Sequence, residues 1–200
     1  LAAGAYGVGN FEGAAYVMAR NQGGADRWGQ VQTLVISNTS GSDGFGFSVA
    51  LSGDTLVVAA PGDHVDYSDQ GAVYVFARSG TSWNQAAKLT AADGAQNDFF
   101  GSALALSGDT ALVGVPYDNV GANWGQGSAY VFTRSGTTWT LAQKLTASDG
   151  AGDLDKAIDG DKESRWTSGA TQRPGMWLQI DLGQEREISA LTLELARTVE

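Results

Sequence analysis

The sequence predicts an all-β fold built from repeated four-stranded blades, and three observations support that prediction. Residues 100–153 repeat residues 45–99 almost word for word, and such a period indicates a supersecondary unit that buries its apolar face against its own copies. Within each copy, short apolar runs are separated by glycine-containing turns. The composition agrees, because 28 glycines and 17% charged residues in a chain of 200 favour short strands over helices.

The repeated unit contains four predicted strands. Residues 47–53 alternate apolar with small or polar side chains, and a Gly-Asp turn separates them from an apolar run at 55–61. After a polar loop at 62–70, a third strand alternates up to a Ser-Gly turn, and residues 82–91 return as the fourth strand. Four antiparallel strands in about 55 residues match the size of one propeller blade.

The second copy keeps the structural positions of the first, with Phe-Gly at its start, Gly-Asp in its first turn and Tyr-Val-Phe in its third strand. A third, degraded copy lies upstream, where residues 13–20 match the third strand of the unit. The chain is therefore expected to begin in the middle of a blade. We divide it into a partial blade at 1–44, blades at 45–99 and 100–152, and a different segment at 153–200.

Two whole blades and a partial one form an incomplete ring, because propellers use about four to eight blades. An open fragment exposes strand edges and apolar blade faces, which favours association. We therefore expect further chain, or another subunit, to complete the propeller.

The charge and composition exclude several kinds of partner. The formal net charge is -10, from 12 Lys and Arg against 22 Asp and Glu, which disfavours nucleic acid because phosphates are bound by cationic side chains. The absence of cysteine excludes disulfides and thiolate chemistry. No apolar run approaches the roughly 20 residues that a membrane-spanning helix needs, so the chain is not expected to span a membrane.

The repeats resemble the FG-GAP repeat, the blade of integrin α-chain propellers and of many bacterial surface proteins. The resemblance covers about residues 1–150, and it rests on three features: Phe-Gly at each repeat start, an apolar strand that ends in Ala-Ala-Pro or Gly-Val-Pro, and a Gly-x-x-Tyr-Val-Phe strand. In the calcium-binding blades of that family an Asp-rich loop joins the first two strands. Because this chain has short turns there, at 52–55 and 107–110, the family's blade calcium site is not expected.

After Gly150 the repeat ends and another pattern begins. Residues 157–195 contain Ala-x-Asp-Gly-Asp, then Arg-Trp-x-Ser, then Trp-x-x-Ile-Asp-Leu-Gly, followed by an alternating run. This pattern resembles the opening of a discoidin-type domain, the family of coagulation factor V and VIII C domains, which is a jelly roll widely used as a galactose-binding-like carbohydrate module. The resemblance implies a partial jelly roll at 153–200.

The same resemblance implies a calcium site. In that family a structural calcium is commonly held by the Asp-Gly-Asp turn and the hydroxyl residue after it, which match Asp159, Asp161 and Ser164. Calcium prefers such hard oxygen ligands. The alternative is a plain surface turn, because Asp-Gly favours turns whatever it binds. Calcium is thus a candidate cofactor of this segment alone.

Trp124 is the candidate for contact with a partner or ligand, because it lies in a Gly-rich loop and has no counterpart in the other copies. Trp28, Trp83 and Trp139 recur at the repeat period, so we expect them to pack between neighbouring blades.

The loop at 62–70 carries Asp63, Asp66 and Asp69 at a spacing that is able to gather carboxylates around a cation, but the sister loop has a different pattern. We expect a solvated acidic loop. His64 has no serine-glycine elbow or cysteine beside it, and one imidazole in an acidic loop is more often solvated than catalytic. The chain is therefore not expected to be an enzyme.

Three hypotheses for function follow. The first is a non-enzymatic extracellular binding or adhesion module that recognises glycans or protein partners on a cell surface, because both resembled families present loops from rigid β scaffolds. The second is a structural subunit of an extracellular or membrane-associated assembly. The third is an accessory region of a secreted hydrolase whose catalytic domain lies outside this chain. All three place the chain in a secreted or cell-surface location, on the extracellular or periplasmic side.

Overall fold

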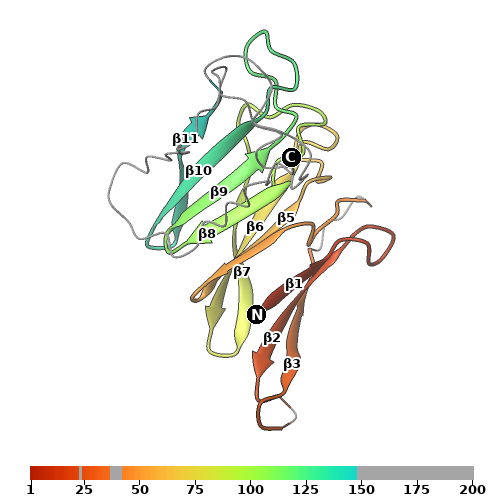
Figure 1. Ribbon diagram of the computed structural model, residues 1–200, viewed down its shortest axis with the longest axis vertical. Helices are drawn as coiled ribbons and strands as arrows, with labels where there is room; N and C mark the ends of the chain where they lie inside the picture. Colours follow the sequence, from red (N-terminus) through yellow and green to blue (C-terminus); the bar gives the residue numbers. More distant parts are fainter. Residues whose placement is uncertain (23, 37–41, 148–200) are drawn as a thin grey trace, which may run out of the picture.

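The computed structural model describes residues 1–22, 24–36 and 42–147, and these residues form three antiparallel sheets arranged side by side (Figure 1). The first sheet contains β1 (Ala2–Ala5), β2 (Ala14–Arg20) and β3 (Trp28–Leu34). The second contains β4 (Val49–Ser52), β5 (Thr55–Ala60), β6 (Ala72–Ser79) and β7 (Ser82–Leu89). The third contains β8 (Ala103–Ser107), β9 (Thr110–Val115), β10 (Ser128–Ser135) and β11 (Thr138–Leu145).

Each four-stranded sheet is a meander in which consecutive strands pair with one another. Two-residue turns join the first strand to the second and the third to the fourth, and each begins with a glycine at positive φ: Gly53, Gly80, Gly108 and Gly136. A glycine in this position satisfies the backbone of a tight hairpin at no steric cost. In the first sheet β1 pairs with β2 as β5 pairs with β6, with Ala5 opposite Ala14 where Ala60 is opposite Ala72.

The cores lie between the sheets, because both faces of the middle sheet are covered. Successive side chains of a strand point to opposite faces, so Leu56 and Val58 of β5 pack toward the first sheet while Val57 and Ala59 pack toward the third. This explains why β5 is apolar at nearly every position and buried throughout its length. The stacking of copies predicted from the repeat is therefore the source of the apolar core.

The Phe-Gly pair at each repeat start closes the joint between two sheets. Phe100 is fully buried, and its N–H donates to the Gln70 carbonyl at 2.9 Å. Gly71 has a φ of 88°, and a Cβ on it would lie 2.4 Å from the Phe100 carbonyl oxygen. The close approach therefore requires glycine at position 71. Phe45 and Gly13 form the same contact at the first joint, where a parallel bridge joins them.

The prediction of an all-β fold built from four-stranded blades is confirmed: the described residues contain strands and turns and no helix. No helix among these residues is long and apolar enough to span a membrane. The predicted jelly roll and the predicted calcium ligands Asp159, Asp161 and Ser164 lie outside the described residues.

Candidate partner-binding site

The connections of each sheet lie at two opposite ends, because neighbouring strands are antiparallel. One end, which we call the hairpin end, carries the two-residue turns. The other, which we call the loop end, carries the longer connections: 61–71 and 116–127 inside the sheets, and 90–102 between the second and third sheets. Binding residues are concentrated on such loops when a rigid scaffold holds them.

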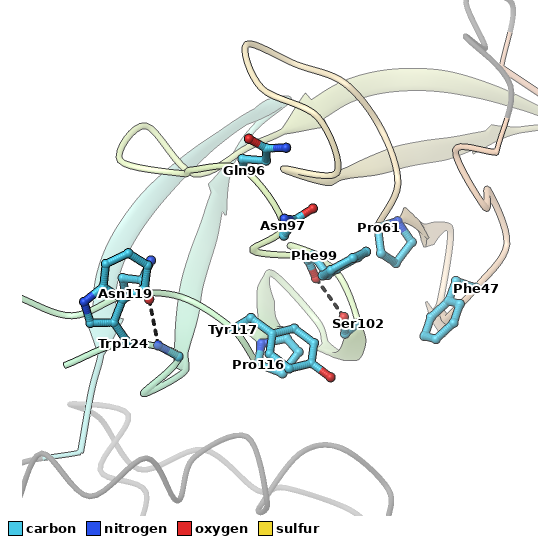
Figure 2. A pocket seen from close by; sticks show the side chains of 11 residues that line it. Phe47, Pro61, Gln96, Asn97, Phe99, Ser102, Pro116, Tyr117, Asn119 and Trp124 are labelled. Carbon is cyan, nitrogen blue, oxygen red and sulfur yellow. Dashed lines mark hydrogen bonds between the residues drawn. The ribbon is translucent and has the colours of Figure 1, made fainter.

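The loop end is hollowed between the second and third sheets. The hollow has a volume of about 730 Å³ and is lined by the rings of Phe47, Phe99, Tyr117 and Trp124, together with the prolines that follow β5 and β9. Figure 2 shows these rings and the amides of Gln96, Asn97 and Asn119 around the same space. The volume falls within the range of about 300–1,000 Å³ that is typical of ligand pockets.

A second, smaller hollow of about 230 Å³ continues toward the first sheet. It shares Phe47, Pro61 and Phe99 with the first hollow and adds the rings of Tyr6 and Phe11. Tyr6 and Phe47 have ring centroids 5.4 Å apart, and Phe99 and Tyr117 have centroids 5.7 Å apart. We call the two hollows together the aromatic groove, which runs across the loop ends of all three sheets.

Two aromatic residues of this groove have a backbone conformation that aromatic residues rarely adopt. Phe99 has a φ of 54° and Phe11 a φ of 69°, both in the left-handed region. In the other copies, Gly44 matches Phe99 with a φ of 66°, and Asp69 and Gly125 match Phe11 with φ of 54° and 59°. None of these positions carries a second aromatic ring. Placing a bulky side chain there costs about 1–2 kcal/mol that glycine avoids. Local strain of this kind is concentrated at functional sites.

Trp124 lies at the edge of the groove with 90% of its surface exposed. Its loop is held by three contacts: the Gly125 N–H donates to Asn119 Oδ1 at 2.7 Å, and Val120 and Asn123 exchange two backbone hydrogen bonds of 3.1 Å. The loop therefore has a defined shape, although its tryptophan has little contact with the protein. Whether a partner contacts Trp124 stays a prediction.

The loop at 61–71 is held from below by a buried carboxylate. Asp63 is 3% exposed; Tyr74 donates its hydroxyl to Asp63 Oδ2 at 2.5 Å, and Lys88 forms an ion pair of 2.9 Å with it. The Lys88 ammonium also lies 5.2 Å from the Tyr74 ring centroid. The expected solvated acidic loop is wrong for Asp63, because a buried carboxylate needs a cation and hydrogen bonds in place of water. Asp66 is exposed as expected.

The third sheet repeats this cluster around Asp118. Lys144 forms ion pairs of 2.6 Å with Asp118 and 2.7 Å with Asp93, and its ammonium lies 5.1 Å from the Tyr130 ring centroid. Burial acts to lower the pKa of Lys144, but the two carboxylates outweigh it and raise that pKa above its ordinary value. Burial likewise acts to raise the pKa of Asp93, and the hydrogen bonds from Lys144 and Tyr130 outweigh it and lower that pKa.

Asp98, in the same region, is a buried carboxylate that is only partly satisfied by hydrogen bonds. It is 2% exposed, its Oδ2 accepts the Ala95 N–H at 2.6 Å, and its Oδ1 has no hydrogen-bond partner. Burial raises the pKa of Asp98 and outweighs the hydrogen bond from the Ala95 N–H, which acts to lower it. The nearby carboxylate of Asp118 adds to the rise. The ionised carboxylate therefore destabilises the folded chain at neutral pH.

Asp54 and Asp109, in equivalent hairpin turns, pair with arginines of their own sheets. Arg78 donates to Asp54 Oδ1 at 2.6 Å, and Arg134 donates to Asp109 Oδ1 at 2.8 Å. These hydrogen bonds join each hairpin turn to the third strand of its own sheet and so stabilise the turn. Among the described residues, no group of three or more His, Cys, Asp or Glu side chains is placed to hold a metal ion.

Of the three repeated tryptophans, Trp83 is buried against the first sheet, and Trp139 is half-buried and packs against the core between the second and third sheets. The prediction that Trp28 also packs between blades is wrong, because 54% of its surface is exposed. Trp28 and Trp83 occupy equivalent positions, opposite Arg20 and Arg78. Trp28 therefore lies on the face of the first sheet that is turned away from the second.

His64 has a neighbour that the sequence did not indicate. The Gly62 carbonyl lies 2.9 Å from Nδ1 and accepts a hydrogen bond from Nδ1–H, and Nε2 lies 3.0 Å from Ser68 Oγ. The same hydroxyl lies 3.2 Å from Asp69 Oδ2. Neither His64 nor Ser68 is a lining residue of the aromatic groove. Asp69, which Ser68 contacts, lines the smaller hollow of the groove.

Most of the groove was not foreseen from the sequence, because its rings come from segments far apart in the chain. A usable signal exists in the comparison of the two copies. Phe99 and Tyr117 stand where the preceding copy has Gly44 and Gly62, so each marks a gained aromatic ring at a loop position. Trp124 was found by the same kind of difference.

Two family models match the chain. The model described as FG-GAP repeat matches residues 28–76 and 83–132, and the model described as F5/8 type C domain matches residues 141–199. Each FG-GAP match begins in the last strand of one sheet and ends within the third strand of the next. The F5/8 type C match begins within β11, which pairs with β10 in the third sheet. A search of curated proteins finds no match to this chain.

Proposed function

We propose that this chain, which belongs to the FG-GAP repeat family and continues into an F5/8 type C domain, is a non-enzymatic extracellular module that binds a partner in its aromatic groove. Both families are typical of binding and adhesion proteins of the cell surface and extracellular space, and their domains are typically non-catalytic. Family membership alone does not give the site, so the assignment rests on the groove.

The observation that carries the proposal is the pair of left-handed aromatic residues, Phe11 and Phe99. A fold that needed only a turn at these positions would be more stable with glycine, as Gly44 and Gly125 illustrate in equivalent places. The rings they provide lie in a surface hollow, where they contribute little to the buried cores. We infer that the backbone strain is retained because the rings contact a partner.

The support beneath the groove is rigid, as a binding site requires. The ion pairs of Lys88 and Lys144 fix the starts of both loops. Gln70 and Gln126 fix their ends, since each amide nitrogen donates to a backbone carbonyl of the segment that follows the fourth strand, at 3.2 and 2.7 Å. A partner would therefore meet a preformed surface and would lose little free energy in ordering it.

The test compares binding of groove variants to an array of immobilised glycans and purified extracellular-matrix proteins. Trp124→Ala removes the exposed ring, and Phe99→Gly restores the residue of the preceding copy. We expect each to weaken binding about ten-fold or more, as for a central interface residue. Leu141→Ala is the control, because it removes an exposed apolar side chain of β11 that does not line the groove. Equal binding by all four proteins would contradict the proposal.

A second candidate function, assembly with another blade, is favoured by the outward face of the first sheet. Trp28 and Val31 of β3 are exposed, as is Val35 directly after it, and the equivalent of Trp28 in the second sheet is buried by its neighbour. Another blade of the same repeat type is the occupant that fits such a face. Sedimentation of the full chain tests it: Trp28→Ala should shift an assembled species toward monomer, while a monomeric parent chain would exclude self-assembly.

A further inference from the structure

We infer that the partner of the aromatic groove is an extended neutral glycan, an inference that depends on the proposed function and deepens it. The inference uses three properties of the groove: the chemistry of its walls, its charge and its length.

The apolar surface of the groove comes from rings. Its described lining contains six aromatic residues and two prolines, and it contains no Leu, Ile, Val or Met, although these residues dominate the cores between the sheets. Flat rings suit the C–H faces of a pyranose, which stack on them. Protein interfaces are enriched in Met and Arg as well as in aromatic residues, and the described lining contains neither Met nor Arg.

The polar groups among these rings are mainly amides and hydroxyls. Gln96, Asn97 and Asn119 line the groove, and each carries both a donor and an acceptor. A sugar hydroxyl also donates and accepts, so an amide is able to satisfy it with two complementary hydrogen bonds. A few oriented polar groups set in an aromatic wall are the usual composition of a specific small-molecule or oligomer site.

The charge of the groove argues against an anionic partner. None of the described lining residues is Lys or Arg, and Asp69 contributes a carboxylate. Elsewhere in the described chain, Arg20, Arg78, Lys88, Arg134 and Lys144 are each paired with aspartate. With a chain net charge of -10, a uronate polymer or a sulfated glycan would be repelled.

The length of the groove favours a chain of several sugars. Phe47, Pro61 and Phe99 line both hollows, so a ligand that occupies one is able to continue into the other. Tyr6, which contacts Phe47, lines only the smaller hollow, and Tyr117, which contacts Phe99, lines only the larger one. Affinity should therefore rise with chain length until both hollows are filled, because the second contact becomes intramolecular once the first has formed.

The experiment uses the full chain and titrates it with neutral polysaccharides (mannan, xylan, β-glucan and galactan) and with polygalacturonate and alginate, followed by the oligosaccharide series of whichever polymer binds. The expected result is binding to a neutral polymer, stronger for longer oligosaccharides, weakened about ten-fold by Trp124→Ala and by Tyr6→Ala, and unchanged by Leu141→Ala, which removes an exposed side chain that does not line the groove. Both groove variants are on the surface, and a circular dichroism melt matching that of the parent chain shows that each is folded.

Four outcomes would overturn the inference. Preference for the acidic polymers would contradict the charge argument. Binding that persists in Trp124→Ala and Tyr6→Ala, with or without chelator, would place glycan recognition elsewhere in the chain. Failure of every polysaccharide to bind, together with a matrix protein whose binding is lost in Trp124→Ala, would exclude the glycan and leave the proposed function standing. If neither Trp124→Ala nor Tyr6→Ala weakened binding to any glycan or matrix protein, both the glycan inference and the proposed function would be contradicted.

Discussion

The loops at 61–71 and 116–127 occupy the same place in consecutive sheets, and they differ in an instructive way. Both begin with proline, place a buried aspartate two residues later, and end in Gln-Gly, with the glycine N–H donating to that aspartate's carbonyl at 3.0 Å. Between these shared points the first loop carries His64 and Tyr67, and the second carries Asn123 and Trp124. The shared residues are buried and paired, and the differing ones are mostly exposed.

The comparison separates support from recognition. A residue that recurs in both loops contacts the sheets, so it is constrained by packing and by burial of its charge. A residue that differs between the loops faces solvent, where a partner contact constrains it more than the fold does. Four predictions test this division, from the largest expected effect to the smallest.

The largest effect is expected for Gly71→Ala. The added Cβ would lie 2.4 Å from the Phe100 carbonyl oxygen at a φ of 88°, so the joint between two sheets must move, at a cost of about 4 kcal/mol. Gly121→Ala is the matched control at a loop tip: its φ is 62° and its Cβ would meet nothing within 4 Å, so about 1 kcal/mol is expected. Urea unfolding measures both, and equal losses would contradict the division.

Lys144→Met should destabilise the chain by about 2 kcal/mol, because it leaves the buried Asp118 without its cation. The comparison is Arg20→Met, which breaks an ion pair exposed on both sides and should cost about 0.5 kcal/mol or less. The pKa of Lys144 is raised in the folded chain. Its contribution to the free energy of unfolding is therefore fully present below its ordinary pKa of 10.5 and is lost as the pH rises through the folded-state pKa. A Lys144→Met chain as stable as the parent at pH 7 would show that the ion pairs are unimportant.

Asp98→Asn should stabilise the chain by about 1 kcal/mol at pH 7, since it removes a buried charge while keeping an oxygen for the Ala95 N–H. Because the pKa of Asp98 is raised, the cost of its ionised form is absent below the ordinary value of 3.8 and appears as the pH rises through the folded-state pKa. The gain should therefore vanish in thermal melts below about pH 3.8. Asp93→Asn is the control with the opposite sign at pH 7, because its pKa is lowered.

The smallest effect is expected for Ser68→Ala, at a loop tip. The hydroxyl contacts His64 and Asp69 in a partly exposed position, so its loss should change stability by no more than about 0.5 kcal/mol. The parent chain should also fail to react with a fluorophosphonate probe, which labels activated serines. Labelling that is lost in Ser68→Ala would reveal a nucleophile and contradict a purely non-catalytic role.

The blades were predictable from the sequence and the groove was not, for a physical reason. Hairpin glycines such as Gly53 and the continuous apolar run of β5 act over a few residues, so their consequences are visible in the local pattern. The groove joins Tyr6, Phe47 and Tyr117, which come together only when three sheets stack. The left-handed backbone of Phe99 is likewise not indicated by the sequence, because phenylalanine rarely adopts it. Trp124 was predicted because a difference between repeats needs no tertiary information.

The charged cluster around Asp63 was missed for a related reason. Three aspartates in one loop suggest solvation, and nothing local indicates that Lys88, a whole strand pair away, pairs with one of them. Comparing copies would have helped, because Asp118 and Lys144 occupy the same two positions in the second copy. A pair of opposite charges that recurs in register is a better sign of contact than either charge alone.

The offset between the matched repeats and the sheets has a consequence for how such a protein grows. A segment such as 83–132 holds the last strand of one sheet and three strands of the next, and it contains most residues of the core between them, Phe100 included. A tandem duplication of this segment would therefore also duplicate most of the residues that pack one sheet against the next. Each added copy would extend the arc by one blade without requiring a new interface to evolve, while its loop tip would be free to diverge toward another ligand.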